Sequence, residues 1–111
     1  MRGLPDTASK QSTSYNTAAS GNDSIVTIAA PTDGYNVIDW VIWSYDATPT
    51  SGSVTVTDST NNTTLAKWSI TTDGPGGTFF SERGMVTPQN TITTFTLADG
   101  GAGKHLTVQY R

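Results

Sequence analysis

The chain is poor in the residues that build covalent and metal-held structures. It has no cysteine among its 111 residues, so disulfides and thiolate metal sites are excluded. It has a single histidine, His105, which leaves that side chain without a second imidazole as a partner. No apolar run approaches the roughly 18 residues of a membrane-spanning helix. The first six residues also lack the apolar core of a signal peptide, so we expect neither a membrane partner nor standard secretion.

Charge is scarce and slightly negative. Only 14% of the residues are charged, and nine Asp and Glu against six Lys and Arg give a net charge of −3. The six cationic side chains are scattered along the chain. Binding to nucleic acid through counterion release needs clustered Lys and Arg, so we expect no nucleic-acid partner.

Threonine and serine take the place of the missing charge. Threonine favours strands and serine favours turns, so this bias indicates β structure. Three Trp, four Tyr and three Phe are spread along the chain, which is not the composition of a disordered segment. The length fits one domain with one modest core.

From Ser24 onward, short alternating runs recur between turn signals. The expected strands span residues 24–29, 35–45, 53–57, 63–71, 78–80, 85–86 and 91–97, with a last strand that ends at Tyr110. Val54 and Val56 should face inward, whereas Ile92 is out of phase with Phe95 and predicts a bulge near residues 93–94. The pattern predicts an all-β, antiparallel β-sandwich, jelly-roll-like, with seven to eight strands.

The first 22 residues differ from the rest. They are small and polar, and Leu4 and Tyr15 are their only large apolar side chains. We expect an extended N-terminal arm over residues 1–22, held by a neighbouring subunit or partner, and a β-sandwich domain over residues 23–111. The alternative is an arm that folds back on its own sheet.

The expected strand over residues 35–45 is apolar on both faces. One parity holds Ile38, Trp40 and Ile42, and the other holds Val37, Val41, Trp43 and Tyr45. Only one face of such a strand can pack on the domain's own core, so the face of Val41 and Trp43 should be covered by the arm, a loop or another subunit. Asp39 has the same parity and is expected either to pair with Lys or Arg across an interface or to protect a strand edge.

No group of residues in the sequence indicates a catalytic site. His105 is expected to be a surface residue at the start of the last strand, since it has no evident catalytic partner. A pocket that brings His105 against a carboxylate and a hydroxyl would favour a hydrolase instead. Asp-Gly pairs at 33–34, 73–74 and 99–100 are expected to form turns rather than calcium sites, because no Asp-x-Asp-x-Asp spacing supports them. We predict no catalytic, cofactor-binding or metal-binding residues.

Three segments carry a resemblance. Residues 43–56, 68–80 and 90–108 resemble stretches of small virion-associated β proteins of tailed bacteriophages, and the similarity extends over about residues 25–111. It implies an accessory structural role such as capsid decoration, and it carries over no catalytic residues. The chain departs from that pattern at Ser81-Glu82-Arg83-Gly84, where a more apolar, proline-containing segment is expected.

The expected function is therefore structural and not enzymatic. The resemblance implies a capsid decoration or cement protein in the virion, assembled in the host cytoplasm. Its partners would be the major capsid protein or another virion protein, and further copies of itself in a homo-oligomer such as a trimer. The predicted interface comprises Leu4, Tyr15, Asp39, Val41, Trp43, Tyr45 and Arg83. The alternative is a carbohydrate-binding, lectin-like module that uses exposed aromatic side chains from the set Tyr35, Trp43 and Tyr45.

Overall fold

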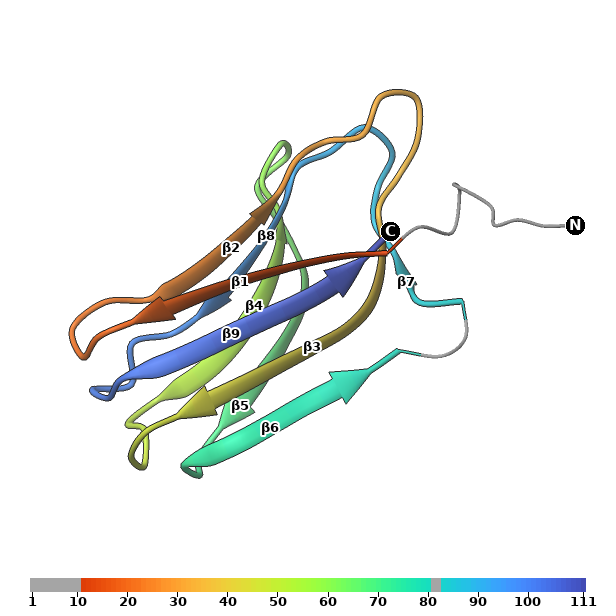
Figure 1. Cartoon of the computed structure of the whole chain (residues 1–111). Coiled ribbons are helices and arrows are strands. Elements are labelled where there is room, and N and C mark those ends of the chain that lie inside the picture. The colour runs from red at the N-terminus through yellow and green to blue at the C-terminus, as the bar shows by residue number, and fades with distance from the viewer. Residues whose placement is uncertain (1–10, 81–82) are drawn as a thin grey trace, which may run out of the picture.

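Two antiparallel sheets packed face to face form the protein in the computed structural model (Figure 1), which describes residues 11–80 and 83–111. These residues form nine strands and no helix. The strands are β1 Ser12–Ala18, β2 Ser24–Ile28, β3 Val37–Tyr45, β4 Gly52–Asp58, β5 Thr63–Ile70, β6 Gly74–Phe79, β7 Met85–Val86, β8 Thr93–Leu97 and β9 Lys104–Tyr110. The predicted all-β, jelly-roll-like sandwich is confirmed, with more strands than expected.

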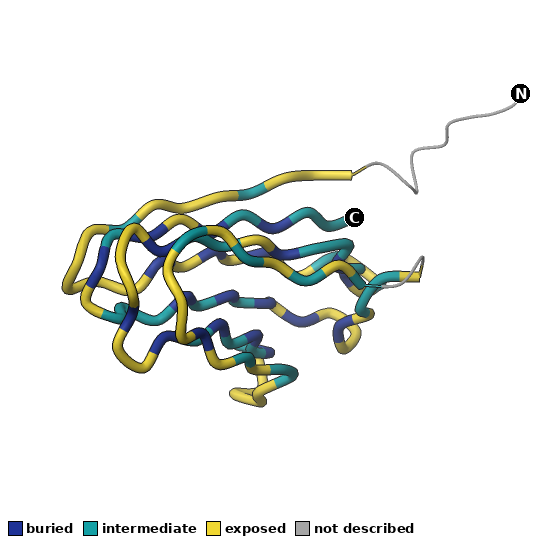
Figure 2. Tube along the Cα trace, turned by 90° about the horizontal axis from the view of Figure 1, so that it is seen from below, coloured by how far each residue is buried: buried dark blue, intermediate teal, exposed yellow. Residues whose placement is uncertain are grey.

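One sheet has five strands and the other has four. The five-stranded sheet runs β1-β9-β3-β6, and the short strand β7 pairs with the beginning of β3. The four-stranded sheet runs β2-β8-β4-β5. Figure 2 shows the buried positions lying along the strands between the two layers, while exposed positions dominate β1 and the turns.

The core comes from alternate residues of both sheets, as the sequence pattern predicts. Val54 and Val56 of β4 face inward, and so do Leu106 and Val108 of β9. In each strand the intervening residues are more exposed, because successive side chains point to opposite faces of a sheet.

Part of the expected arm belongs to the sandwich. Residues 12–18 form β1, which pairs with β9 from Ser12 opposite Tyr110 to Ala18 opposite Lys104. The side chain of Asn16 also reaches the other sheet, where its Oδ1 accepts hydrogen bonds from the Ser24 hydroxyl and the Ile25 N–H at 2.8 and 3.3 Å. The sandwich therefore begins at residue 12 rather than 23, and for residues 12–18 the chain folds back on its own sheet.

A bulge in β3 decides which of its residues reach the core. The register against β9 shifts between Ile38 and Trp40, so Asp39 is the extra residue. As a result Ile38 and Val41 both face inward although their parities differ. Val41 is 0% exposed and Tyr45 is 1% exposed. The prediction that Val41 and Tyr45 form an outward interface is therefore wrong, because the domain's own core buries both.

The bulge predicted near residues 93–94 is absent from the described structure. Thr93, Phe95 and Leu97 of β8 are all buried, and β8 pairs in continuous register with β2 and β4. Ile92 lies before the strand, so its parity has no bearing on the strand's phase. The second irregularity lies instead between β4 and β5, at Val56 and Thr57.

A fully buried lysine holds one end of the sandwich together. The Lys104 ammonium donates hydrogen bonds to the carbonyls of Ala19 and Asn22, at 3.0 and 2.6 Å, and lies 3.4 Å from Asp99 Oδ1. Asp99 Oδ1 also accepts a hydrogen bond from the Gly21 N–H at 2.7 Å. The β1–β2 and β8–β9 loops are thus tied to each other through β9.

A candidate binding groove on the outer face of the five-stranded sheet

The outer face of the five-stranded sheet presents three rows of side chains. Residues directly opposite each other in an antiparallel pair point to the same face, so the strand register fixes each row. In the order β1, β9, β3 and β6 the rows are Thr13-Gln109-Trp40-Phe79, Tyr15-Thr107-Ile42-Gly77 and Thr17-His105-Ser44-Pro75. The middle row ends on a glycine, and this gap forms the groove.

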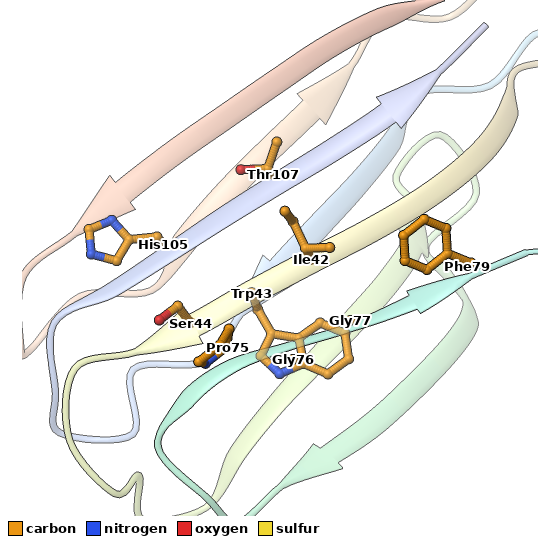
Figure 3. A pocket seen from close by; sticks show the side chains of 9 residues that line it. All are labelled: Ile42, Trp43, Ser44, Pro75, Gly76, Gly77, Phe79, His105 and Thr107. Carbon is orange, nitrogen blue, oxygen red and sulfur yellow. The ribbon is translucent and has the colours of Figure 1, made fainter.

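Gly77 leaves a depression between two bulky neighbours on β6. Pro75 and Phe79 point to the same side of the strand as Gly77 and stand on either side of it. A Cβ atom added at Gly77 would lie 2.8 Å from Ile42 Cγ2, so the Ile42 side chain forms the floor of the gap. The groove has a volume of about 360 Å³, and Figure 3 shows its lining: Ile42, Trp43, Ser44, Pro75, Gly76, Gly77, Phe79, His105 and Thr107.

Trp43 reaches the groove from the inner side of the sheet. Its indole lies against Gly76, where an added Cβ would be 2.6 Å from Trp43 Nε1. The same ring packs on Trp68, with 6.4 Å between ring centroids, and Trp68 packs on Phe80 at 6.2 Å. Trp43 is therefore half in the core and half in the groove wall, rather than on an outward face as predicted.

The end of the groove away from Phe79 is polar. Thr17 Oγ1 lies 3.1 Å from His105 Nδ1, and Asp46 Oδ1 lies 3.4 Å from His105 Nε2. The sequence had suggested that a hydroxyl and a carboxylate around His105 would favour a hydrolase. The His105 and Asp46 side chains are 51% and 61% exposed, however, and water at both groups weakens the electrostatic coupling that a buried triad relies on. The arrangement fixes the orientation of the imidazole ring beside the groove.

The other predicted interface residues lie apart from one another. Tyr15 is exposed on β1, in the same row as Thr107 and Ile42. Asp39 Oδ1 accepts a hydrogen bond from Arg111 Nε at 2.9 Å, so Asp39 pairs with an arginine of its own chain. Arg83 is exposed in the turn before β7, and Leu4 lies outside the described residues.

Sequence reasoning missed the main groove residues. Phe79 was expected in a short strand without a role, yet its side chain is 75% exposed beside the groove. The available signal was the pair Gly76-Gly77 directly before Thr78-Phe79-Phe80, because glycine in a strand marks a place where another group can approach closely.

A second exposed apolar surface lies at the β7 end of the same sheet. Tyr35 and Val86 are both exposed there, and their two chain segments are joined where the Thr87 N–H donates to the Asn36 carbonyl at 3.0 Å. Gln11 contacts Asp39 at this end, with 3.2 Å between Nε2 and Oδ2. We call Tyr35, Arg83 and Val86 the β7-end surface.

Within residues 11–80 and 83–111, no group of three or more His, Asp or Glu side chains is placed to hold a metal ion. The described residues include no helix long and apolar enough to cross a membrane.

Comparison with known proteins identifies the architecture. No protein-family model matches the chain, and no curated protein matches its sequence. The NLP core of Drosophila, a structure that addresses pentamer formation and histone binding, is similar with a TM-score of 0.53 and 15% identity over 90% of this chain and 95% of that one. The CBM36-1 domain of a multidomain xylanase from the hindgut metagenome of Trinervitermes trinervoides is similar with a TM-score of 0.50 and 11% identity over 91% and 94%. These likenesses show a shared β-sandwich fold.

A viral likeness is weaker. The virus-like particle of the extra small virus of the prawn Macrobrachium rosenbergii gives a TM-score of 0.35 and 11% identity, over 96% of this chain and 80% of that one. A likeness of this degree has no bearing on function.

Proposed function

We propose that this chain is a non-catalytic structural protein of a tailed-bacteriophage particle, most simply a capsid decoration protein. In this role it binds the major capsid protein or another virion protein and stabilises the particle surface. The resemblance of residues 43–56, 68–80 and 90–108 to virion-associated β proteins supports the proposal.

The exposed β7-end surface is the observation that carries the proposal. Tyr35 and Val86 expose large apolar side chains on neighbouring segments at this end, and Arg83 adds a charge that can pair with a partner carboxylate. Aromatic and arginine side chains are the residues that contribute most to protein–protein binding. Gln11, the first residue that the structure describes, also lies at this end, where its side chain contacts Asp39.

Attachment to particles tests this proposal directly. We would add purified protein to particles from a phage whose copy of the gene is deleted, and measure co-sedimentation. The double variant Tyr35→Ser and Val86→Ser should reduce binding at least tenfold. The matched control is Ile25→Ser, which removes an exposed apolar side chain from β2 in the other sheet.

The outcomes separate clearly. Loss of binding in the double variant but not in the control supports attachment through the β7-end surface. Equal binding by all three proteins would overturn that attachment, and a wild-type protein that never sediments with particles would overturn the structural role. Analytical ultracentrifugation of the free protein gives the number of copies in the proposed homo-oligomer.

Carbohydrate binding is the second candidate function, and a different observation favours it. The groove at Gly77 combines an apolar floor with hydroxyl and imidazole groups at one end. Ligand sites commonly pair a mainly apolar lining with a few placed polar groups. The groove and the β7-end surface involve different residues, so both functions can coexist in one molecule.

A further inference from the structure

We propose that the groove at Gly77 binds one neutral pyranose unit of a glycan. The inference rests on the second candidate function and names its ligand class. The sugar ring would lie over Ile42 and against Phe79, with its hydroxyls directed to Ser44 and Thr107 beside the His105 ring.

The shape of the groove suits a ring rather than an extended chain. Pro75 and Phe79 close it on two sides along β6, and Gly77 keeps the space between them free of a side chain. Its volume of about 360 Å³ is at the lower end of the roughly 300–1,000 Å³ typical of small-ligand sites. The exposed ring of Phe79 offers an aromatic face that can pack on the apolar face of a sugar.

The polar groups match hydroxyls in particular. The hydroxyls of Ser44 and Thr107 can each both donate and accept hydrogen bonds, as sugar hydroxyls do. Ser44 lies on β3 opposite His105, and Thr107 lies on β9 opposite Ile42, so both hydroxyls lie on the side of the groove away from β6. Thr17 and Asp46 contact the two ring nitrogens of His105, so its imidazole contributes a groove wall next to the two hydroxyls.

The charges near the groove favour a neutral ligand. No Lys, Arg, Asp or Glu is among the lining residues. The carboxylate of Asp46 lies beside His105, so an anionic ligand would meet a like charge at this end. The neighbouring Lys104 is 0% exposed and its ammonium binds loop carbonyls, so it is not available to an anion in the groove. A phosphate, sulfate or sialic acid is therefore disfavoured relative to a neutral sugar.

The test uses the full chain and two kinds of measurement. Binding to an array of neutral, sialylated and sulfated glycans identifies the class of ligand. The best neutral glycan is then titrated into ¹⁵N-labelled protein, and the indole N–H signal of Trp43 is followed, since Trp43 Nε1 lies at Gly76 in the groove wall. We expect this signal to shift on binding while that of Trp68 shifts less.

Two variants test the site by different routes. Gly77→Val fills the depression, and Phe79→Ala removes an exposed ring whose loss should leave the fold intact. Each should weaken binding at least tenfold. Gly34→Ala is the matched control for the glycine change, because an added Cβ there meets only the Thr32 carbonyl at 3.9 Å; its affinity should stay within twofold of wild type. Circular dichroism verifies that all three variants are folded.

Each result has a defined meaning. Binding to neutral glycans that both groove variants abolish supports the inference. Binding only to sialylated or sulfated glycans would refute the neutral class but leave carbohydrate binding intact. Binding that survives in Phe79→Ala and Gly77→Val would place the site elsewhere. No binding to any glycan, or capture of a protein loop by the groove instead, would remove both the inference and the second candidate function.

Discussion

Replacing Lys104 with methionine should destabilise the protein by about 3 kcal/mol. The ammonium makes two short hydrogen bonds to the carbonyls of Ala19 and Asn22, and hydrogen bonds that involve a charged group contribute roughly 1.5–3 kcal/mol each. Two bonds at the low end of this range give about 3 kcal/mol. Methionine preserves most of the volume of the lysine stem, so a cavity adds little. The contact with Asp99 adds little, because that side chain is 41% exposed and the pair is 3.4 Å apart.

Equilibrium unfolding in urea, followed by tryptophan fluorescence, measures this change. The control is Lys67→Met on β5, where the lysine is exposed and substitution should alter the free energy of unfolding by no more than about 0.5 kcal/mol. A loss below about 1 kcal/mol for Lys104→Met would show that water replaces the ammonium at the two carbonyls, and that the lysine does not hold the loops.

Three further predictions concern pH and the N-terminus. The Gly21 N–H, with help from Lys104, holds the pKa of Asp99 below its ordinary value of 3.8. The stability that ionised Asp99 contributes to the fold is present above that value and is lost as the pH falls through the lower folded pKa. Asp99→Asn should therefore flatten the acid limb of the plot of stability against pH. Burial raises the pKa of Tyr45 above 10.0. The stability that the protonated Tyr45 contributes to the fold is therefore present below pH 10 and declines as the pH rises from there toward the folded pKa. Tyr45→Phe should make the loss of stability at alkaline pH less steep. Deleting residues 1–10 should leave the melting temperature nearly unchanged, whereas deleting 1–20 removes β1 and should lower it clearly, as differential scanning calorimetry will show. These expectations would be contradicted if the free energy of unfolding of the point variants depended on pH as in the wild type. Equal melting temperatures for the two deletions would contradict the third expectation.

The strands were predictable where one rule governed the residues. In β4 and β9 the apolar residues alternate with threonine and other polar side chains, and burial on one face follows from the period of two. The turn role of the Asp-Gly pairs followed from the same local chemistry, and Gly74 and Gly100 indeed have positive φ angles.

The orientation of β3 was not predictable from alternation alone. Apolar residues at 38, 41, 43 and 45 change phase once, and a bulge at Asp39 accounts for that change. The sequence contained the signal, but an apolar residue at nearly every position concealed it. Recognising the bulge would have placed Val41 and Tyr45 in the core and Trp40 and Ile42 outside.

The groove could not be derived from sequence, because it is a product of register. Gly77, Ile42, Thr107 and Tyr15 are far apart in the chain and form one row only once four strands are aligned. The buried Lys104 is a similar case, since its partners are backbone carbonyls of a loop more than eighty residues away. Neither feature has a local sequence signature.

The pairing of the first strand with the last has a mechanical consequence. Ser12 stands opposite Tyr110, so the two ends of the sandwich emerge side by side. A force that pulls these ends apart would act across the β1–β9 ladder and peel it open one hydrogen-bonded pair at a time, because antiparallel bonds lie perpendicular to the strands. The sandwich should therefore resist force better when it is bound through the faces of its sheets than when it is stretched between Ser12 and Tyr110.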